Sequence, residues 1–392
     1  MKILFINAVC GVGSTGRIVT DLARQAKSKG HTVKVACSTI EPIKGVRPDE
    51  VITVGSRQDY YLHNLLSRLT DHEGLFSRSV TRKLLSQIKE YDPDLVHLHN
   101  LHGHWINYEL LFRYLAEEKK KVVWTLHDCW AFTGHCSYFS LLKCEQWKSR
   151  CLHCNGLHGY PMCYGKGDVA NNFDRKKKAF TSVGDMTIVT PSEWLASLVR
   201  ESFLGKYPVE VVHNKIDMSV FTPTASDFRK AHHAEGKTIV LGVANVWSQS
   251  KGLDDFLKLR ELLDERYVMV MVGLTQEQMA GIPGNIIGIQ RTNSARELAE
   301  IYTAADVFVN FTYQDNYPTV NLEAIACGTP VVSYMTGGSC EAFDKHSGVA
   351  VRQGAVGEVP GAIERALLLD EEEILQRAKA FYSYGDYLSL IS

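Results

Sequence analysis

Short apolar runs alternate with longer amphipathic stretches along this chain. The apolar runs of the first half cover residues 3–6, 33–37, 94–100, 122–128, 186–192 and 209–212. Those of the second half cover residues 238–243, 268–272, 307–310 and 330–332. Continuous apolar runs separated by helical patterns are typical of strands buried on both faces in parallel sheets. The pattern therefore predicts an α/β protein.

A polar, charged break interrupts this alternation near the middle of the chain. Residues 213–235 carry no apolar periodicity, so we expect a linker there. A chain of 392 residues is also too long for one ordinary core. We predict an N-terminal domain at 1–212, a C-terminal domain at 236–380, and a terminal segment, 381–392, that packs back toward the first domain.

We expect structural rather than functional roles for one amphipathic region and for two basic runs. Residues 60–89 read as amphipathic helices, and Leu62, Leu65, Leu66 and Leu69 share one face, which we expect to pack into the core. The basic runs at 119–121 and 176–178 are expected to be solvated. Weak attraction to anionic lipid headgroups is the alternative for these runs.

Composition and charge exclude some classes of function and indicate a cellular location. The net charge of −1 gives no global field for nucleic acid. No window approaches the roughly 20 apolar residues of a membrane span. The first apolar run leads directly into a glycine loop, so it reads as a strand rather than a signal peptide. We expect a cytoplasmic protein whose ten cysteines are mainly thiols or metal ligands.

Residues 135–163 form a cysteine-rich loop with little apolar periodicity. The four cysteines that could supply thiolates to a structural zinc ion are Cys136, Cys144, Cys151 and Cys154. Disulfides and free buried thiols are the competing explanations, and the uneven spacing weakens the zinc hypothesis. A catalytic zinc is not expected, because no open ligand set with a general base is visible.

The ends of the predicted strands carry candidate chemistry in the first domain. Gly13 lies in a glycine loop after the first strand, where a ligand could approach the backbone. The spacing is not that of a dinucleotide fingerprint, and no acidic residue closes the second strand. His99 and His127 follow two later strands. Ligands bind beyond the carboxyl ends of parallel strands, so we favour a site role for His127.

The stretch 315–332 has the strongest pattern in the second domain. Asp315 and Glu323 flank Pro318, which suits the start of a helix. The free N–H groups of Thr319 and Val320 would then point at an anion. Carboxylates at both ends of an anion cradle suit a ligand with hydroxyls on either side of a phosphate, as in a nucleotide sugar.

Two further residues extend this cradle. Lys251 stands at the foot of a predicted helix, where a cation opposes the helix dipole, so it reads as an anion ligand. Glu341 lies in a glycine-containing loop, 336–341.

These motifs, taken in order, resemble the retaining glycosyltransferases of family 4, including bacterial exopolysaccharide and capsule glycosyltransferases. The resemblance rests on four stretches: 214–217 with 221–223, Lys251-Gly252, 315–332, and Gly337-Gly338 with Glu341. It implies the GT-B fold, in which two Rossmann-like domains face each other across a cleft and a C-terminal helix crosses back.

The resemblance also implies roles for the candidate residues. Glu323 would bind the donor ribose, and Asp315 would hold hydroxyls of the transferred sugar. Lys251 and the N–H groups of Thr319 and Val320 would hold the diphosphate. From the other domain, Gly13 would approach the donor and His127 would line the acceptor side. Glu341 would belong to the donor site.

The implied reaction moves a hexosyl-type sugar from a nucleoside diphosphate to a hydroxyl group, with retention and without a catalytic metal. The acceptor would be a saccharide or a lipid-linked saccharide at the inner face of the membrane, with peripheral membrane contact. A sugar-nucleotide epimerase of the same fold is one alternative. A catalytically weak nucleotide-sugar-binding protein is another.

The chain departs from the family pattern at two positions. Val246 occupies the place of an arginine found five residues before the lysine in many relatives. Arg17 or Arg291 could supply the missing cation; otherwise the leaving group is less well stabilised. Lys215 replaces the usual linker glycine.

Overall fold

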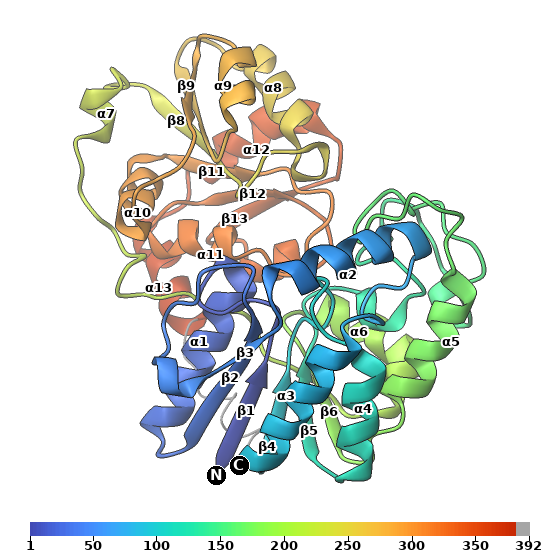
Figure 1. Cartoon of the computed structure of the whole chain (residues 1–392). Helices are drawn as coiled ribbons and strands as arrows, with labels where there is room; N and C mark the ends of the chain where they lie inside the picture. The colour runs from blue at the N-terminus through green and yellow to red at the C-terminus, as the bar shows by residue number, and fades with distance from the viewer. Residues whose placement is uncertain (382–392) are drawn as a thin grey trace. The chain divides into compact units, whose positions relative to one another are not determined.

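The computed structural model describes residues 1–381 as two compact units. The first unit contains Met1–His213, and the second begins at Asn214 (Figure 1). Each unit is built on its own parallel sheet. The predicted packing of the terminal segment falls on residues 382–392, which lie outside the described part of the chain.

The first unit is a seven-stranded parallel sheet in the order β3-β2-β1-β4-β5-β6-β7. Its strands are β1 (Lys2–Ile6), β2 (Thr32–Ser38), β3 (Val51–Val54), β4 (Leu95–Leu98), β5 (Lys121–Thr125), β6 (Met186–Thr190) and β7 (Val209–Val211). Its helices are α1 (Gly13–Ser28), α2 (Arg57–Thr70), α3 (Arg78–Tyr91), α4 (Tyr108–Glu117), α5 (Val169–Phe180) and α6 (Glu193–Glu201).

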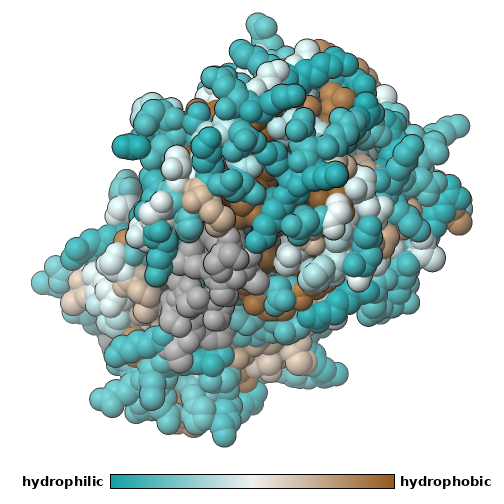
Figure 2. Space-filling view, turned by 90° about the horizontal axis from the view of Figure 1, so that it is seen from below, coloured by the Kyte–Doolittle hydropathy of each residue, from teal (hydrophilic) through white to brown (hydrophobic). Residues whose placement is uncertain are grey.

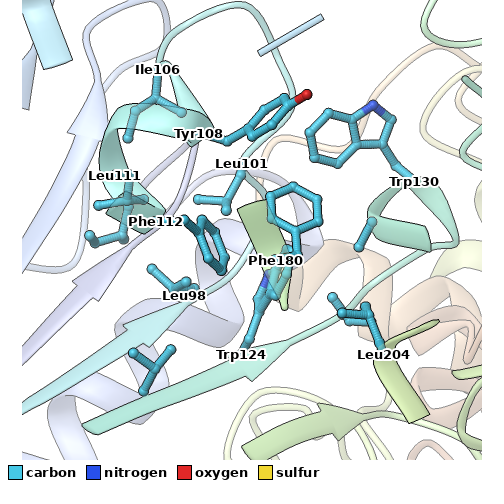
Figure 3. Packing of buried hydrophobic residues seen from close by; sticks show 14 of the residues in the cluster. Leu98, Leu101, Ile106, Tyr108, Leu111, Phe112, Trp124, Trp130, Phe180 and Leu204 are labelled. Carbon is cyan, nitrogen blue, oxygen red and sulfur yellow. The ribbon is translucent and has the colours of Figure 1, made fainter. Parts of the chain in front are cut away.

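Side-chain alternation along β1 divides the core of this unit between two faces. Ile3 and Phe5 pack in the cluster that contains the buried side of α1. Leu4 and Ile6 belong to the larger cluster on the other face, with residues of α3, α4 and α5. Aromatic rings fill that larger cluster, where Phe180 lies 4.8 Å from Trp124 between ring centroids (Figure 3). Burial on both faces explains why these strands read as continuous apolar runs.

The second unit repeats this design with a six-stranded parallel sheet in the order β10-β9-β8-β11-β12-β13. Its strands are β8 (Thr238–Val243), β9 (Tyr267–Val272), β10 (Ile286–Ile289), β11 (Val307–Asn310), β12 (Val331–Tyr334) and β13 (Gly348–Val351). Its helices are α7 (Phe228–Ala231), α8 (Leu253–Leu262), α9 (Gln276–Gly281), α10 (Ala295–Ala304), α11 (Thr319–Ala326), α12 (Val359–Ala366) and α13 (Glu371–Phe381).

The expected packing of α2 is wrong. Leu62, Leu65 and Leu69 are exposed, whereas His63 and Ser67 are buried. The reason is that His63 has hydrogen-bond partners on the inner side, the Ser77 hydroxyl at 2.8 Å and the backbone N–H of Gly74 at 3.2 Å. Because the His63 ring is hydrogen-bonded in this way, it can be buried, and its burial turns the leucines outward.

The expectation of a solvated basic run is also wrong for Lys176. Its side chain is buried, and its ammonium group donates to the carbonyls of Trp130 at 2.8 Å and Thr133 at 3.1 Å. It lies 3.7 Å from the centroid of the Trp130 ring. Burial lowers the pKa of Lys176 from 10.5 to about 7. This lysine therefore anchors α5 to the loop after β5.

Candidate functional site

The two sheets each reverse their strand order at one point, and the candidate residues follow the strands at those points. In the second unit the reversal falls between β8 and β11. Lys251 follows β8, and Asp315 follows β11. In the first unit it falls between β1 and β4, which precede Gly13 and His99. Open parallel sheets bind ligands at such switch points.

Lys251 and Asp315 form an ion pair across the switch point of the second unit. The Lys251 Nζ lies 2.7 Å from Asp315 Oδ2 and 3.5 Å from the Thr312 hydroxyl. The other oxygen of Asp315 accepts from the backbone N–H of Asn316 at 2.9 Å. Both side chains remain partly accessible, so the pair can open to a ligand at little cost, as expected of an ion pair near the surface.

Close backbone packing fixes the position of Lys251. Gly252 adopts a φ of +75°, and a Cβ there would lie 2.3 Å from the Cβ of Phe311. Only glycine allows this approach. The N–H of Tyr313 also donates to the carbonyl of Ser250 at 2.8 Å. The loop before α8 is thereby held against the segment that carries Asp315.

Helix α11 begins beside Asp315, as the sequence predicts. Pro318 is its N-cap residue, no side chain of the described chain caps this end, and no acidic residue occupies the first turn. Thr319 and Val320 are partly accessible. The end of a helix without an acidic side chain keeps its positive partial charge for an external anion.

A buried amide connects α11 with the glycine loop that carries Glu341. Asn321 accepts from the Asn310 amide at 2.8 Å and donates to the carbonyl of Ser339 at 3.0 Å. Glu341 is in the short 3-10 turn Ser339–Ala342. The stretches 315–323 and 336–341, which are separate in the sequence, are therefore brought together within one unit.

Glu323 is buried on α11, and the hydroxyl of Tyr302 donates to its Oε2 at 3.2 Å. Tyr302 from α10 is a partner that the sequence pattern did not reveal. Burial and the neighbouring Glu323 raise the pKa of Tyr302 well above 10. The tyrosine hydroxyl therefore stays protonated and donates a hydrogen bond to the carboxylate.

The first unit presents two stacked histidines after the strands at its switch point. The His99 Nδ1 lies 3.0 Å from the His127 Nε2, and the two rings are stacked. Burial lowers the pKa of His127 from 6.5 to about 4 and that of His99 well below 6.5. Gly13 begins α1 with a φ of +64°, and no atom lies within 4 Å of where its Cβ would be.

Charged partners near His127 were missed at the level of sequence. The His102 Nε2 lies 2.9 Å from Asp128 Oδ2, and its Nδ1 lies 3.0 Å from the Tyr160 hydroxyl. Asp128 holds the pKa of His102 above 6.5 despite burial. The only signal in the sequence was the position of Asp128 directly after His127. Nothing in the spacing connects these two residues with Tyr160.

The cysteine-rich loop contains a close pair of thiols. The Sγ atoms of Cys136 and Cys154 lie 3.4 Å apart. Backbone N–H groups donate to sulfur at Cys151, from Gly134 at 3.3 Å, and at Cys154, from Gly156 at 3.3 Å. Among residues 1–381, no group of three or more His, Cys, Asp or Glu side chains could hold a metal ion. Structural zinc at Cys136, Cys144, Cys151 and Cys154 stays a prediction.

Arg17 and Arg291, considered as replacements for the missing cation, belong to different units. Val246 is exposed in the loop after β8. Arg291 follows β10, two strands away from β8 in the same sheet, and Arg17 is exposed in α1 of the first unit. Lys251 is accordingly the cation that this structure pairs with Asp315.

Two parallel Rossmann-like sheets are also the architecture of the GT-B glycosyltransferases, with which the structure aligns over nearly its whole length. Sucrose-phosphate synthase (tll1590) from Thermosynechococcus elongatus aligns with a TM-score of 0.69, covering 100% of this chain and 97% of that one, at 14% identity. Alr3699/HepE of Anabaena in complex with UDP gives 0.66, covering 98% and 96%, also at 14% identity. At these identities the likeness concerns the fold, which is GT-B as the sequence predicted.

The chain belongs to Glycosyltransferase Family 4, whose model matches residues 15–220. The model "Glycosyl transferases group 1" matches residues 224–384. WcaC of Escherichia coli (strain K12), named as a colanic acid biosynthesis glycosyl transferase, is 26% identical over 98% of this chain and 96% of its own. The D-inositol 3-phosphate glycosyltransferase of Mycolicibacterium smegmatis is 30% identical over 50% of this chain and 48% of its own. The protein is therefore a glycosyltransferase, as predicted.

The membrane question has one structural finding. Within residues 1–381, no helix combines the length and the apolar character needed to cross a bilayer.

Proposed function

We propose that this enzyme transfers a sugar from a nucleoside-diphosphate donor to a hydroxyl group of a saccharide or lipid-linked saccharide, with retention at the anomeric carbon. The observation that carries the proposal is the Lys251–Asp315 ion pair at 2.7 Å beside the N-terminus of α11. Solved structures of HepE hold UDP and UDP-glucose, which supports a donor of this class. The name of WcaC supports a role in polysaccharide synthesis.

Electrostatic stabilisation of the leaving group is the main catalytic element of this proposal. Negative charge grows on the departing diphosphate as the bond to the sugar breaks. Lys251 exchanges Asp315 for the diphosphate, and the N–H groups of Thr319 and Val320 add the field of the helix end. This arrangement needs no metal, so we propose metal-independent chemistry.

The carboxylates hold the donor on either side of its diphosphate. Asp315, released from Lys251, orients hydroxyls of the transferred sugar, and Glu323 binds the ribose. Tyr302 holds one oxygen of Glu323 at 3.2 Å, which fixes the direction of the carboxylate. Glu341, held near α11 through Asn321, and Gly13 complete the donor contacts in this proposal.

His127 serves the acceptor side. A pKa of about 4 keeps its ring neutral near pH 7, so it can accept or donate a hydrogen bond without adding charge. His99 fixes the ring by the 3.0 Å contact between nitrogens. The acceptor oxygen bonds to the anomeric carbon on the face from which the diphosphate departs, and its proton passes to the departing diphosphate oxygen. Attack on that same face gives retention.

A panel of nucleotide sugars, incubated with and without saccharide acceptors, tests the proposal. We expect donor consumption that depends on both Lys251 and Glu323. The proposal fails if no donor is consumed and if Lys251→Ala and Glu323→Ala leave nucleotide-sugar binding unchanged. Release of free nucleotide without an acceptor would instead support the epimerase.

A further inference from the structure

Asp255 is a buried carboxylate that lies outside all of the sequence motifs described above. Hydrophilic residues cover most of the face seen in Figure 2, whereas Asp255, in the first turn of α8, is only 6% exposed. A charged side chain is rarely buried unless hydrogen bonds or an opposite charge compensate for the lost water. The partners of this carboxylate therefore indicate its role.

Two tyrosine hydroxyls donate to one oxygen of Asp255. The hydroxyl of Tyr334 lies 2.9 Å from Asp255 Oδ2, and the hydroxyl of Tyr313 donates to the same atom. Burial and the hydrogen bond to this carboxylate raise the pKa of Tyr313 to about 12 and raise the pKa of Tyr334 above 10, so both hydroxyls stay protonated. The N-terminal end of α8 also favours a negative charge in its first turn. Two donors and the helix end together compensate for the burial of Asp255.

The other oxygen of Asp255 makes a weak ionic contact. The Lys258 Nζ lies 3.9 Å from Asp255 Oδ1, and the lysine side chain is 66% exposed. An ion pair that is so long and so accessible contributes little to stability. The two tyrosines are therefore the main partners of the carboxylate.

Tyr313 connects Asp255 with the loop that carries Asp315. It comes two residues before Asp315, and its backbone N–H donates to the carbonyl of Ser250 at 2.8 Å. Its side chain reaches α8, where its hydroxyl meets the carboxylate. Both the backbone and the side chain of Tyr313 are thus fixed. The course of the chain directly before Asp315 therefore depends on Asp255.

Tyr334 connects the same carboxylate with the glycine loop that carries Glu341. It is fully buried and is the last residue of β12, directly before that loop. Gln353, which follows β13, forms a second bridge. Its amide donates to the carbonyl of Tyr313 at 3.0 Å and to the Thr336 hydroxyl at 3.0 Å. The loops after β11 and β12, which are adjacent strands, are therefore fixed to each other and to α8.

We propose that Asp255 is a positioning residue of the donor site. By holding Tyr313 and Tyr334, it fixes the two loops whose carboxylates orient the sugar of the donor. The position of Lys251 is fixed instead by the close packing of its neighbouring glycine. The inference rests on the proposed function, because it gives Asp255 a task in sugar transfer. Loss of Asp255 therefore slows transfer more than it weakens diphosphate binding.

Steady-state kinetics test this role, with the nucleotide sugar that the panel described above identifies as the donor. Asp255→Ala should lower kcat about tenfold and change the Kd of the corresponding nucleoside diphosphate less than about threefold. Asp255→Asn should recover most of kcat, because its amide oxygen can still accept from both hydroxyls. The matched control is Asp254→Ala, which removes the exposed carboxylate beside Asp255 and should leave kcat unchanged.

A double substitution shows whether Asp255 acts through Asp315. Because Asp315→Asn already removes an orienting carboxylate, adding Asp255→Ala should lower transfer by less than the product of the two single effects. Equal unfolding temperatures would show that the variants are folded. If Asp255→Ala does not fold, Tyr313→Phe keeps the ring, removes one hydroxyl, and should give the same pattern with a smaller loss of kcat.

Hydrogen exchange gives a measurement that needs no turnover. Peptides that contain residues 311–315 and 334–341 should lose protection in Asp255→Ala and keep it in Asp255→Asn and Asp254→Ala. Unchanged protection of these loops in Asp255→Ala would overturn the proposal. So would a fall in kcat that an equal loss of diphosphate affinity accompanies, or single effects at Asp255 and Asp315 that multiply.

Failure of the proposed function gives a different result. If no donor is consumed, or if Asp315→Asn leaves transfer unchanged, the proposed function fails, and the exchange measurement still decides whether Asp255 fixes the loops. An enzyme that is sensitive to Asp315→Asn but transfers normally as Asp255→Ala contradicts this inference alone.

Discussion

The residues at the carboxyl edges of the two sheets differ in charge and in accessibility. In the second unit, Lys251 and Asp315 form an ion pair whose two side chains are partly accessible. In the first unit, His97, His99 and His127 form a stacked set with lowered pKa values, in which His97 and His99 are buried and His127 is partly accessible. Twelve of the fifteen histidines lie in residues 1–213. His232, His233 and His346 of the second unit are exposed.

This difference matches the different ligands proposed for the two edges. An accessible ion pair can exchange a partner for a phosphate group, which suits the donor side. Buried neutral rings exclude water and offer hydrogen bonds of fixed direction, which suits an acceptor hydroxyl. The two edges should therefore respond differently to mutation and to pH.

The largest expected effect comes from removing the cation of the second unit. Lys251→Ala should lower kcat by about 100- to 1,000-fold, because the diphosphate loses a preorganised positive group. Steady-state kinetics with the preferred donor measure this. Lys258→Ala is the matched control. This lysine lies in α8, the helix that follows Lys251, and it pairs with Asp255 at 3.9 Å rather than with Asp315. Equal activity of the two variants would remove Lys251 from the mechanism.

Acid should destabilise the first unit before the second. The folded pKa values of His63 and His127 are lowered to about 4 and that of His97 to about 3, against 6.5 when unfolded. Between about pH 6.5 and 4 the unfolded chain therefore binds more protons, so acidification favours unfolding by on the order of 1–3 kcal/mol per histidine. His102 has the opposite sign, because its folded pKa is raised.

Hydrogen exchange followed by mass spectrometry measures this difference segment by segment. Peptides of β4 and β5 should lose protection as the pH falls from 7 to 5, while peptides of β8 and β11 keep theirs. Exchange rates need correction for their intrinsic pH dependence. Equal loss of protection in both units would contradict the role given to the buried histidines.

A smaller effect is expected from neutralising Asp315. Asp315→Asn should reduce transfer roughly 10- to 100-fold, since the sugar loses an orienting carboxylate. Binding of the nucleoside diphosphate should be unchanged or tighter, because Lys251 no longer has a competing partner. Isothermal titration of the diphosphate separates the two effects. Weaker diphosphate binding would show that Asp315 supports the lysine rather than the sugar.

The smallest expected effect on catalysis comes from chelation. A chelator should leave transfer unchanged, because no metal contributes to the proposed step. Metal analysis of protein purified without added zinc tests the separate prediction for Cys136, Cys144, Cys151 and Cys154. Less than about one zinc per chain would end the four-thiolate hypothesis.

Much of the fold was readable because its strands are buried on both faces. Residues 238–243 and 307–310 coincide with β8 and β11. Ser192, the last residue of the apolar run 186–192, accepts from the N–H of Leu195 and caps α6. The edge strands β3, β10 and β13 were missed. Each is incompletely buried, whereas β4 and β11, which are equally short, are buried at all four positions.

The relation between site residues could be predicted from the sequence where the residues are close together along the chain. It could not be predicted where they are far apart along the chain. Asp315, Pro318 and Glu323 lie on one loop and helix, so their relation follows from spacing. The contacts of His102 with Asp128 and Tyr160 depend on three loops meeting in space. The buried face of α2 was predicted wrongly. Periodicity shows that the two faces of the helix differ in polarity, but the hydrogen bonds to His63 determine which face is buried.

Proton NMR of the reaction tests the central claim most directly. The donor is mixed with enzyme in the presence and absence of a saccharide acceptor, and the anomeric signals are followed over time. The account predicts that nucleoside diphosphate is released as a new glycoside forms with the anomeric configuration of the donor. An inverted product, or nucleotide release with epimerised sugar and no acceptor, would contradict it.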